Sequence, residues 1–294
     1  MNTNIAEVTD KTPVNFAPHH LQYCLERSAS EGSSLYYALL FCSPELKKKC
    51  VGLATFAREL QMIPVEVHDP QVARIKLAWW KTEMDRAALG QATHPACLCL
   101  GAPEIAKLGA EAVALVVQSV SDSLELPRYF TQTQWDTASR NWGGELYAMA
   151  AKVAGTTDPE SLGHIKNFGA CAMKLAQLLA LGKTLGEGWH PFPVDTLQKA
   201  GVSVEKLRQR VSNEAFLNLY QDLTDALVTE GQAHWQALPG TERLRLRPLR
   251  ALWRMRTAEL ALLKADGYPV LTQGVKLTPL RKLWIAWSTQ VLRR

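Results

Sequence analysis

The sequence has 294 residues, of which 47% are hydrophobic and 21% charged, with a net charge of +5. This composition is typical of a globular protein with a sizeable core, and it excludes disordered and fibrous chains. The charge is unevenly placed: residues 240–294 contain 12 Lys and Arg against 3 Asp and Glu, or +9, and the other residues carry −4. A basic section of this kind suits a phosphate-bearing ligand, an anionic membrane surface or an acidic partner, but solvated helix faces produce it too.

The six cysteines show no C-x-x-C pair, and most of them lie among apolar residues (positions 24, 42, 50, 97, 99 and 171). This usage predicts free, buried thiols in a reducing compartment. No basic segment followed by an apolar run opens the sequence, and no apolar window is long enough to span a membrane. We therefore expect a cytoplasmic protein without a signal peptide, and peripheral membrane contact stays open.

Taken in order, residues 1–17 are mostly polar, which predicts a flexible leader before a single domain, residues 18–294. From His20 the apolar spacing becomes helical. The helix that carries Arg58 is expected to end at Pro64, because the residue before a proline avoids the α region. Asp69 and Pro70 begin the next helix, which Leu89 and Gly90 close.

Helical patterns then return over about residues 103–125, 133–154, 159–185, 204–237, 246–266 and 277–292. No strand-like alternation persists, and no internal repeat is present. The longest irregular piece, residues 186–204, is too short to separate two domains. The sequence therefore predicts an all-α fold, a single helical bundle with a site in a central cavity between helices.

Several segments resemble the squalene/phytoene synthase family. Ser34-Leu35-Tyr36-Tyr37-Ala38 is similar to its S-F-Y-x-A opening, and Phe56-Ala57-Arg58-Glu59 to its F-C-R-E segment. Residues 74–86 carry the W-W-x-x-E-x-D-R block, which is the most specific match. Over about residues 20–290 further matches follow in the family's order: Thr93-His94-Pro95, Arg128-Tyr129, Gly143, Gln177, Pro193 and Gly201-Val202-Ser203.

The resemblance implies the isoprenoid-synthase fold, a central cavity and a set of diphosphate contacts. Active members condense two prenyl diphosphates head to head, with Mg²⁺ held by two aspartate-rich motifs. Such hard cations take carboxylate oxygens as ligands and neutralise the leaving diphosphate. The positions that match diphosphate-binding or ligand-binding residues are Ser34, Tyr36, Arg58, Arg128, Tyr129 and Gln177.

The sequence departs from the family at both aspartate-rich motifs. The first falls on Gln61, Met62 and Val65, and the second on Leu181 and Leu185, so these positions offer no carboxylate for Mg²⁺. We therefore expect a divergent member that has lost Mg²⁺-dependent prenyl transfer, with no metal and no cofactor. It would bind a prenyl diphosphate, an isoprenoid lipid or, like divergent relatives that act as assembly factors, a protein partner.

The alternative is an active, Mg²⁺-dependent prenyltransferase that makes a squalene-type or phytoene-type product. It requires displaced carboxylates to rebuild the metal site, and the available ones are Glu59, Glu66, Asp69 and Glu187. Arg58 suits a phosphate because its donors form a bidentate fork, but pairing with a nearby carboxylate explains it equally well. Tyr36 either contacts diphosphate or packs in the core.

Other residues are expected to be structural. Trp79 and Trp80 are predicted to pack between helices, and Glu83 with its neighbours Asp85 and Arg86 to form a surface network. His94 fits a hydrogen-bonded turn. His68 and His190 are assigned to the mouth of the cavity, where a metal or acid–base role stays open. Lys183 either holds phosphate or points to water.

The last helical segment combines Trp284 and Trp287 with basic residues. A basic amphipathic helix with tryptophans suits a membrane surface. We favour the other interpretation, in which Leu280, Leu283 and Trp287 pack onto the bundle. The basic residues are not organised around a nucleic-acid-binding module, so no nucleic acid is expected.

Overall fold

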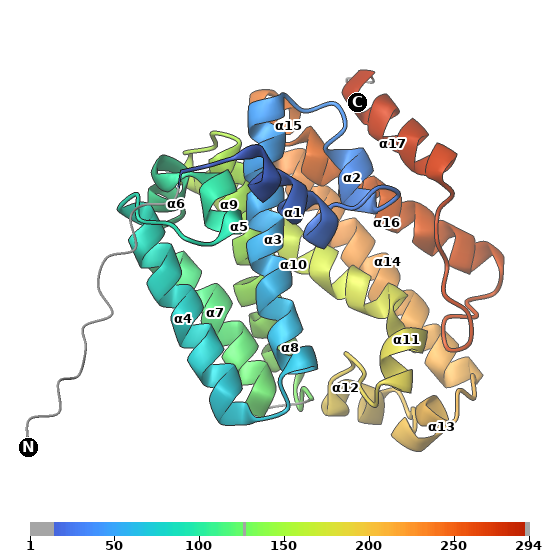
Figure 1. Ribbon diagram of the computed structural model, residues 1–294. Coiled ribbons are helices and arrows are strands. Elements are labelled where there is room, and N and C mark those ends of the chain that lie inside the picture. The colour runs from blue at the N-terminus through green and yellow to red at the C-terminus, as the bar shows by residue number, and fades with distance from the viewer. Residues whose placement is uncertain (1–14, 126–127, 292–294) are drawn as a thin grey trace, which may run out of the picture.

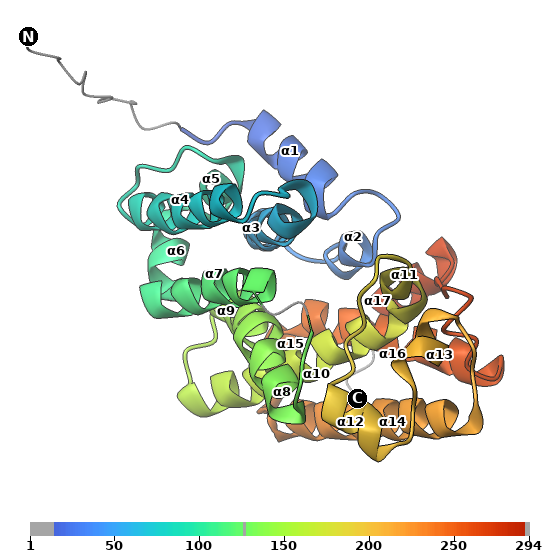
Figure 2. The ribbon, with the colours of Figure 1, turned by 90° about the horizontal axis from the view of Figure 1, so that it is seen from below.

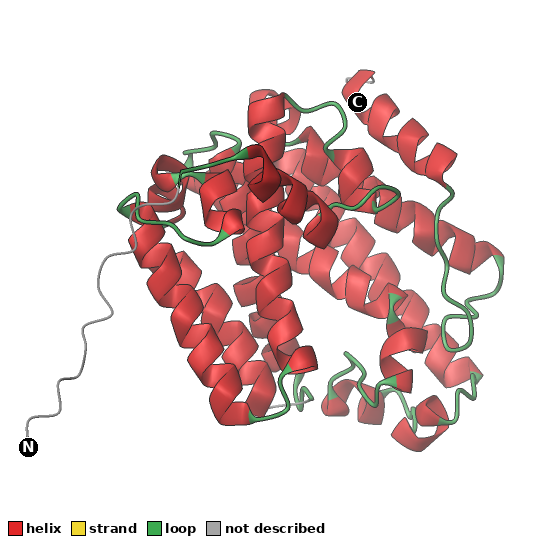
Figure 3. Ribbon diagram, in the orientation of Figure 1, coloured by secondary structure: helices red, strands yellow, loops and turns green. Residues whose placement is uncertain are grey.

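The structure is a computed structural model that describes residues 15–125 and 128–291. Every regular element in these two ranges is helical, as Figure 3 shows, which confirms the all-α prediction. The long helices lie side by side and shorter helices connect them (Figure 1). Across the same ranges, no helix combines the length and apolar character that a membrane crossing needs.

Local sequence rules set where the helices of the first half begin. Proline stands at the start of several of them, where its missing amide would have no helical partner. The side chains of Ser43 and Asp69 accept hydrogen bonds from first-turn amides of the two long helices. The elements are α1 (Pro18–Ser28), α2 (Ser34–Ala38), α3 (Pro44–Glu66), α4 (Pro70–Ala88), α5 (Pro95–Leu100), α6 (Ala102–Leu108) and α7 (Ala110–Glu125).

The second half contains three long helices, α10, α14 and α16. Asp158 and Asn213 cap the first two of them through their side chains. The elements are α8 (Gln132–Ser139), a π-helical turn (Arg140–Gly144), α9 (Glu145–Val153), α10 (Pro159–Leu179), α11 (Leu181–Gly186), α12 (Val194–Lys199), α13 (Val204–Arg208), α14 (Glu214–Ala237), α15 (Gly240–Arg245), α16 (Arg247–Ala265) and α17 (Pro279–Val291).

The prediction that Pro64 ends its helix is wrong by two residues, because α3 continues to Glu66. Proline cannot donate the hydrogen bond of its own position, but the helix closes beyond it through the Val67 amide, which donates to the Ile63 carbonyl at 3.0 Å. The family's first motif therefore lies on continuous helix.

Four segments predicted as single helices are interrupted. Gly109, at a φ of +86°, separates α6 from α7, and Arg210, at +58°, lies between α13 and α14. Ala180 divides α10 from α11. In the segment 133–154 the interruption is the π-helical turn, where Gly143 packs against α10.

The bundle has two main clusters of buried apolar side chains. One joins α3, α4, α7 and α9, and the other joins α10, α11, α14 and α16. Figure 2 shows α3 beside α4 and α5, with α10 in the middle of the bundle. In the first cluster Trp80 is buried and its ring lies 5.4 Å from that of Phe56. Trp79 is 45% exposed, so only half of the predicted tryptophan pair packs in the core.

The orientation of α17 contradicts the packing that we favoured. Leu280, Leu283 and Trp287 face outward, and Leu280 is 79% exposed. The side chains turned toward the bundle are instead Ile285, Ala286, Ser288 and Thr289. This face contacts α2 and α16. In Figure 1 α17 lies at the edge of the bundle, outside α16.

Most of the predicted leader, residues 1–17, lies outside the described residues, which begin at Asn15. The first helix begins at Pro18. The division into a leader and one domain stays a prediction.

Candidate functional site

The positions of the first aspartate-rich motif lie on the C-terminal turns of α3. Gln61 is exposed, Met62 is half-buried and Val65 is 63% exposed. Gln61 keeps one neutral carbonyl oxygen, whereas the thioether of Met62 and the isopropyl group of Val65 have no oxygen for Mg²⁺. This helix therefore offers a metal ion no carboxylate at the motif positions.

The positions of the second motif have become part of the core. Leu181 is fully buried and Leu185 is 8% exposed, both on α11. They belong to the cluster that contains Phe192, Tyr220 and Val270. Apolar side chains have filled the place of a charged site, and their burial stabilises the junction of α10, α11 and α14.

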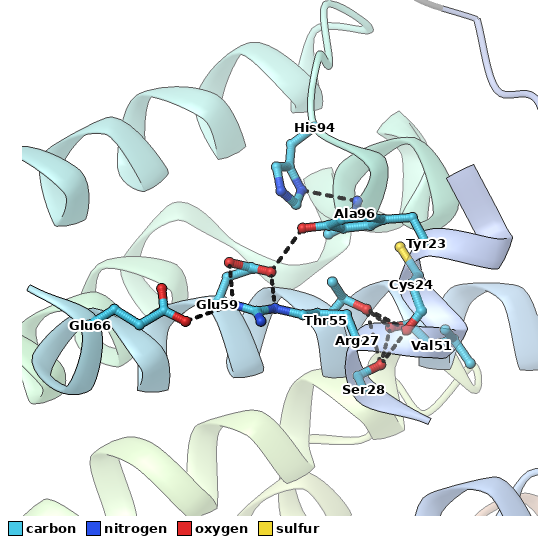
Figure 4. A network of polar contacts seen from close by, with 10 residues as sticks. All are labelled: Tyr23, Cys24, Arg27, Ser28, Val51, Thr55, Glu59, Glu66, His94 and Ala96. Carbon is cyan, nitrogen blue, oxygen red and sulfur yellow. Dashed lines mark hydrogen bonds and ion pairs between the residues drawn. The ribbon is translucent and has the colours of Figure 1, made fainter. Parts of the chain in front are cut away.

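Two of the displaced carboxylates are bound by one arginine (Figure 4). Glu59 accepts hydrogen bonds from Arg27 Nε at 2.7 Å and from the Tyr23 hydroxyl at 3.0 Å. Glu66 lies 3.3 Å from Arg27 Nη2. Arg27 comes from α1, so both carboxylates are tied to this helix. These carboxylates raise the pKa of Arg27, chiefly through the hydrogen bond that Arg27 donates to Glu59.

The other two displaced carboxylates are also engaged. Asp69 caps α4 by accepting the Gln71 amide at 2.8 Å. Glu187 is exposed and lies 3.8 Å from Lys183, a residue that points to water. In residues 15–125 and 128–291 no three His, Cys, Asp or Glu side chains are placed to hold a metal ion. The residues present therefore do not fit the family's Mg²⁺ cluster.

Three of the predicted diphosphate contacts lie on α2 and α3. Arg58 is exposed, and within the described residues its guanidinium makes no hydrogen bond or ion pair. The neighbouring carboxylate of Glu59 pairs with Arg27, so no carboxylate of the described residues pairs with Arg58. Ser34 begins α2, and Tyr36 is half-buried, with its ring 5.3 Å from that of Tyr37. Arg58 is thus available to an anion.

Of the other three predicted contacts, Gln177 lies near the C-terminal end of α10, and Arg128 and Tyr129 lie in the segment before α8. Gln177 accepts a hydrogen bond from Trp135 Nε1 at 2.8 Å. Tyr129 is half-buried; burial raises the pKa of its hydroxyl, and the side chain of Gln177 opposes that shift. Arg128 is exposed and stacks over the Phe130 ring at 5.0 Å. The structure thus brings Tyr129 and Gln177 together; a ligand-binding role for all six residues stays a prediction.

The histidines have different environments. His68 is exposed, whereas His190 is buried, its Nδ1 has no hydrogen-bond partner among residues 15–125 and 128–291, and burial lowers its pKa. His94 caps α5, as its turn assignment predicted, since Nδ1 accepts the Ala96 amide at 3.1 Å. The predicted surface network is wrong for Glu83, which is 1% exposed and accepts the amide of His94 at 2.7 Å.

An apolar cavity of about 140 Å³ lies between α2, α3, α9 and α16, beside the N-terminal half of α3. This lining was not predicted from the sequence. The four-residue spacing of Leu35 in α2 and Leu39, the C-cap of α2, was the available indication. The lining residues are Leu35, Leu39, Leu46, Cys50, Leu53, Ala54, Ala57, Leu146, Tyr147, Ala150, Ala154, Arg245, Leu246, Pro248, Leu249 and Leu252.

The sequence matches a known protein family over most of its length. Residues 29–281 match the family model of squalene/phytoene synthase. The chain belongs to the squalene/phytoene synthase family. As a member of that family it is divergent, since both aspartate-rich motifs are degraded. No curated protein sequence matches the chain.

Solved structures share the fold of this squalene/phytoene synthase family member at low sequence identity. The squalene synthase HpnC from Alicyclobacillus acidocaldarius has 20% identity and a TM-score of 0.71, over 85% of this chain and 95% of its own. A dehydrosqualene synthase in complex with a ligand has 12% identity and a TM-score of 0.78, over 93% and 96%. YisP from Bacillus subtilis subsp. subtilis strain 168 has 14% identity and a TM-score of 0.64, over 92% and 95%. These likenesses confirm the isoprenoid-synthase fold.

Proposed function

We propose that this protein binds an isoprenoid chain, free or as its diphosphate, and carries out no Mg²⁺-dependent prenyl transfer. One observation carries the proposal: the carboxylates that would have to rebuild the metal site are engaged elsewhere. Glu59 and Glu66 are held by Arg27, and Asp69 caps a helix. A diphosphate leaving group without a metal cluster loses the charge neutralisation that its departure requires.

The apolar cavity supports the isoprenoid part of the proposal. Its volume of about 140 Å³ is close to that of the roughly 150 Å³ apolar cavity that takes up benzene. It therefore accommodates a group the size of one isoprene unit, such as the end of a longer chain. Its lining is mostly leucine and alanine, with Arg245 as the one charged residue among the lining residues named above, which suits a hydrocarbon.

The exposed guanidinium of Arg58 supports the diphosphate part. It lies one turn before the degraded motif and has no partner within the described part of the chain. An always-charged, bidentate donor binds phosphate without help from a metal. A protein partner, as in an assembly factor, stays a prediction that no contact in the structure favours.

The test separates binding from turnover. The purified chain is incubated with farnesyl diphosphate and Mg²⁺, and released diphosphate and hydrocarbon product are both measured. Farnesyl diphosphate and farnesol are then titrated by calorimetry, with Mg²⁺ and with EDTA. We expect binding in both conditions and no diphosphate release. Mg²⁺-dependent release that disappears in Arg58→Ala would overturn the proposal.

Two variants locate the binding site. Ala150→Leu adds side-chain volume to the cavity and so takes space from the ligand. It is expected to weaken binding of both ligands about tenfold or more, because each methylene of the ligand that loses its apolar contacts lowers the affinity. Ala78→Leu, at an exposed position of α4, is the matched control and is expected to bind as the parent chain does. Equal binding by both variants would place the ligand outside the cavity.

A further inference from the structure

The last helix presents an apolar stripe to solvent. The α17 outer stripe consists of Leu280, Leu283, Trp284, Trp287 and Val291, all exposed. Their spacing of three, four, seven and eleven residues places them along one side of the helix. Trp284 is 61% exposed, and its ring lies 5.1 Å from that of Trp287. A contiguous exposed stripe of this kind marks an interaction surface.

Polar contacts on the opposite side fix this orientation. Arg254 of α16 donates hydrogen bonds to Thr289 Oγ1 at 2.7 Å and to Ser288 Oγ at 3.0 Å. Lys282 donates to the Gly32 carbonyl at 2.8 Å. Rotating α17 to bury the stripe would remove the partners of the Arg254 guanidinium, which is partly buried, and an unpaired buried charge is costly. The outward stripe is therefore held by specific contacts.

The chain segment that carries the stripe has charged residues of one sign only. Residues 267–294 contain no Asp or Glu, and their basic residues are Lys276, Arg281, Lys282, Arg293 and Arg294. Lys276 and Arg281 are exposed. A basic segment beside an apolar stripe complements a lipid surface with anionic headgroups, which attracts Lys and Arg over about a Debye length. Tryptophan rings favour the boundary between headgroups and acyl chains.

We propose that the α17 outer stripe docks onto a lipid surface that carries anionic headgroups, with α17 lying along the interface. Most of α17 follows the end of the family-model match at residue 281, so the family does not imply this surface. Trp284 and Trp287 enter the headgroup boundary, and the exposed side chains of Lys276 and Arg281 contact the phosphates. The docking surface is independent of isoprenoid binding.

The α17 outer stripe lies on the far side of helices that line the apolar cavity. The inner face of α17 packs on α2 and α16, and both of these helices also line the apolar cavity. Leu252 takes part in both arrangements, since it lines the cavity and packs against the cluster that holds Ile285. Docking through α17 therefore brings the cavity within two helix layers of the lipid.

Vesicle co-sedimentation of the full chain tests the proposal. Vesicles of phosphatidylcholine are compared with vesicles that also contain phosphatidylglycerol, over a range of salt concentrations. The parent chain is expected to bind the phosphatidylglycerol vesicles more tightly and to dissociate as salt rises. The double variant Trp284→Ser/Trp287→Ser is expected to lose about tenfold or more of this binding. Arg281→Gln is expected to weaken only the salt-sensitive part.

The matched control is Trp79→Ser, because Trp79 on α4 is 45% exposed and Trp287 is 43% exposed. This control is expected to bind vesicles as the parent chain does. Far-UV circular dichroism verifies that all variants are folded. Vesicle binding that is equal in the parent and the double variant would overturn the proposal. An absence of vesicle binding by the parent chain would also overturn it. If ultracentrifugation then shows that the parent chain is a dimer and the double variant is a monomer, the stripe joins two copies of the chain instead.

Discussion

Leu181→Asp restores a carboxylate at a position of the second aspartate-rich motif and measures how completely that site has become core. Leu181 is fully buried among apolar side chains. Its loss from the core costs about 2–3 kcal/mol in burial alone. An unpaired carboxylate in the same place loses its hydration, which adds several kcal/mol. The sum, roughly 5 kcal/mol or more, approaches the whole stability of a typical domain, about 5–15 kcal/mol.

Urea denaturation followed by circular dichroism gives the free energy of unfolding for each variant. Leu181→Asn keeps the shape of the substitution without its charge, so the difference between the two variants isolates the charge. Val65→Asp is the control on the first motif: its position is 63% exposed, and at the C-terminal end of α3 it is expected to cost about 1 kcal/mol or less.

Two results would show that Leu181 is not a core position. If the free energy of unfolding of Leu181→Asp is within about 1 kcal/mol of that of the parent chain, the position faces water. Stabilisation of the same variant by Mg²⁺ would show that the position lies in an open metal-binding cavity. Either outcome would return the active prenyltransferase to consideration.

Two further predictions test packing and acid stability. Gly169→Ala is expected to destabilise the protein by about 1–3 kcal/mol in the same urea assay, because the new Cβ would lie 2.5 Å from the Gly143 carbonyl oxygen. The control is Gly163→Ala on the same helix, where the new Cβ has open space. This variant is expected to stabilise the protein by up to about 1 kcal/mol. A loss of stability in both variants would contradict the close approach of α10 and the π-helical turn. Burial lowers the pKa of His94 below its ordinary value of 6.5, so the unfolded chain binds the proton more tightly and stability falls as pH drops below 6.5. His94→Asn keeps an acceptor for the helix cap and is expected to flatten this pH dependence, measured as the midpoint of urea unfolding between neutral and mildly acid pH; an unchanged slope would contradict the assignment.

Much of the fold follows from local features of the sequence. Proline and capping side chains predicted the start of α4 at Pro70, and apolar spacing predicted the long helices. Some interruptions were missed because they depend on contacts between helices, although Gly109 breaks its helix locally through its positive φ. The π-helical turn, for example, forms where Gly143 meets α10, a contact that no helical periodicity reveals.

The loss of the aspartate-rich motifs was also readable from short segments of the sequence. The residue types at Gln61, Met62 and Val65 show by themselves that no carboxylate for Mg²⁺ stands at these positions. Where the remaining carboxylates go depends on distant partners: Glu59 pairs with Arg27, 32 residues earlier in the chain. Burial of Glu83 likewise follows from the loop that returns to it at His94.

By itself the sequence determined the family, the helical architecture and the loss of the aspartate-rich motifs, because these are properties of residue types and their spacing. Only the tertiary structure decided that Leu181 is core and that the α17 outer stripe faces solvent. Periodicity shows which side chains share a helix face, but not which way that face turns. For α17 the choice rests on Arg254, a residue of another helix whose hydrogen bonds hold the polar side of α17 inward.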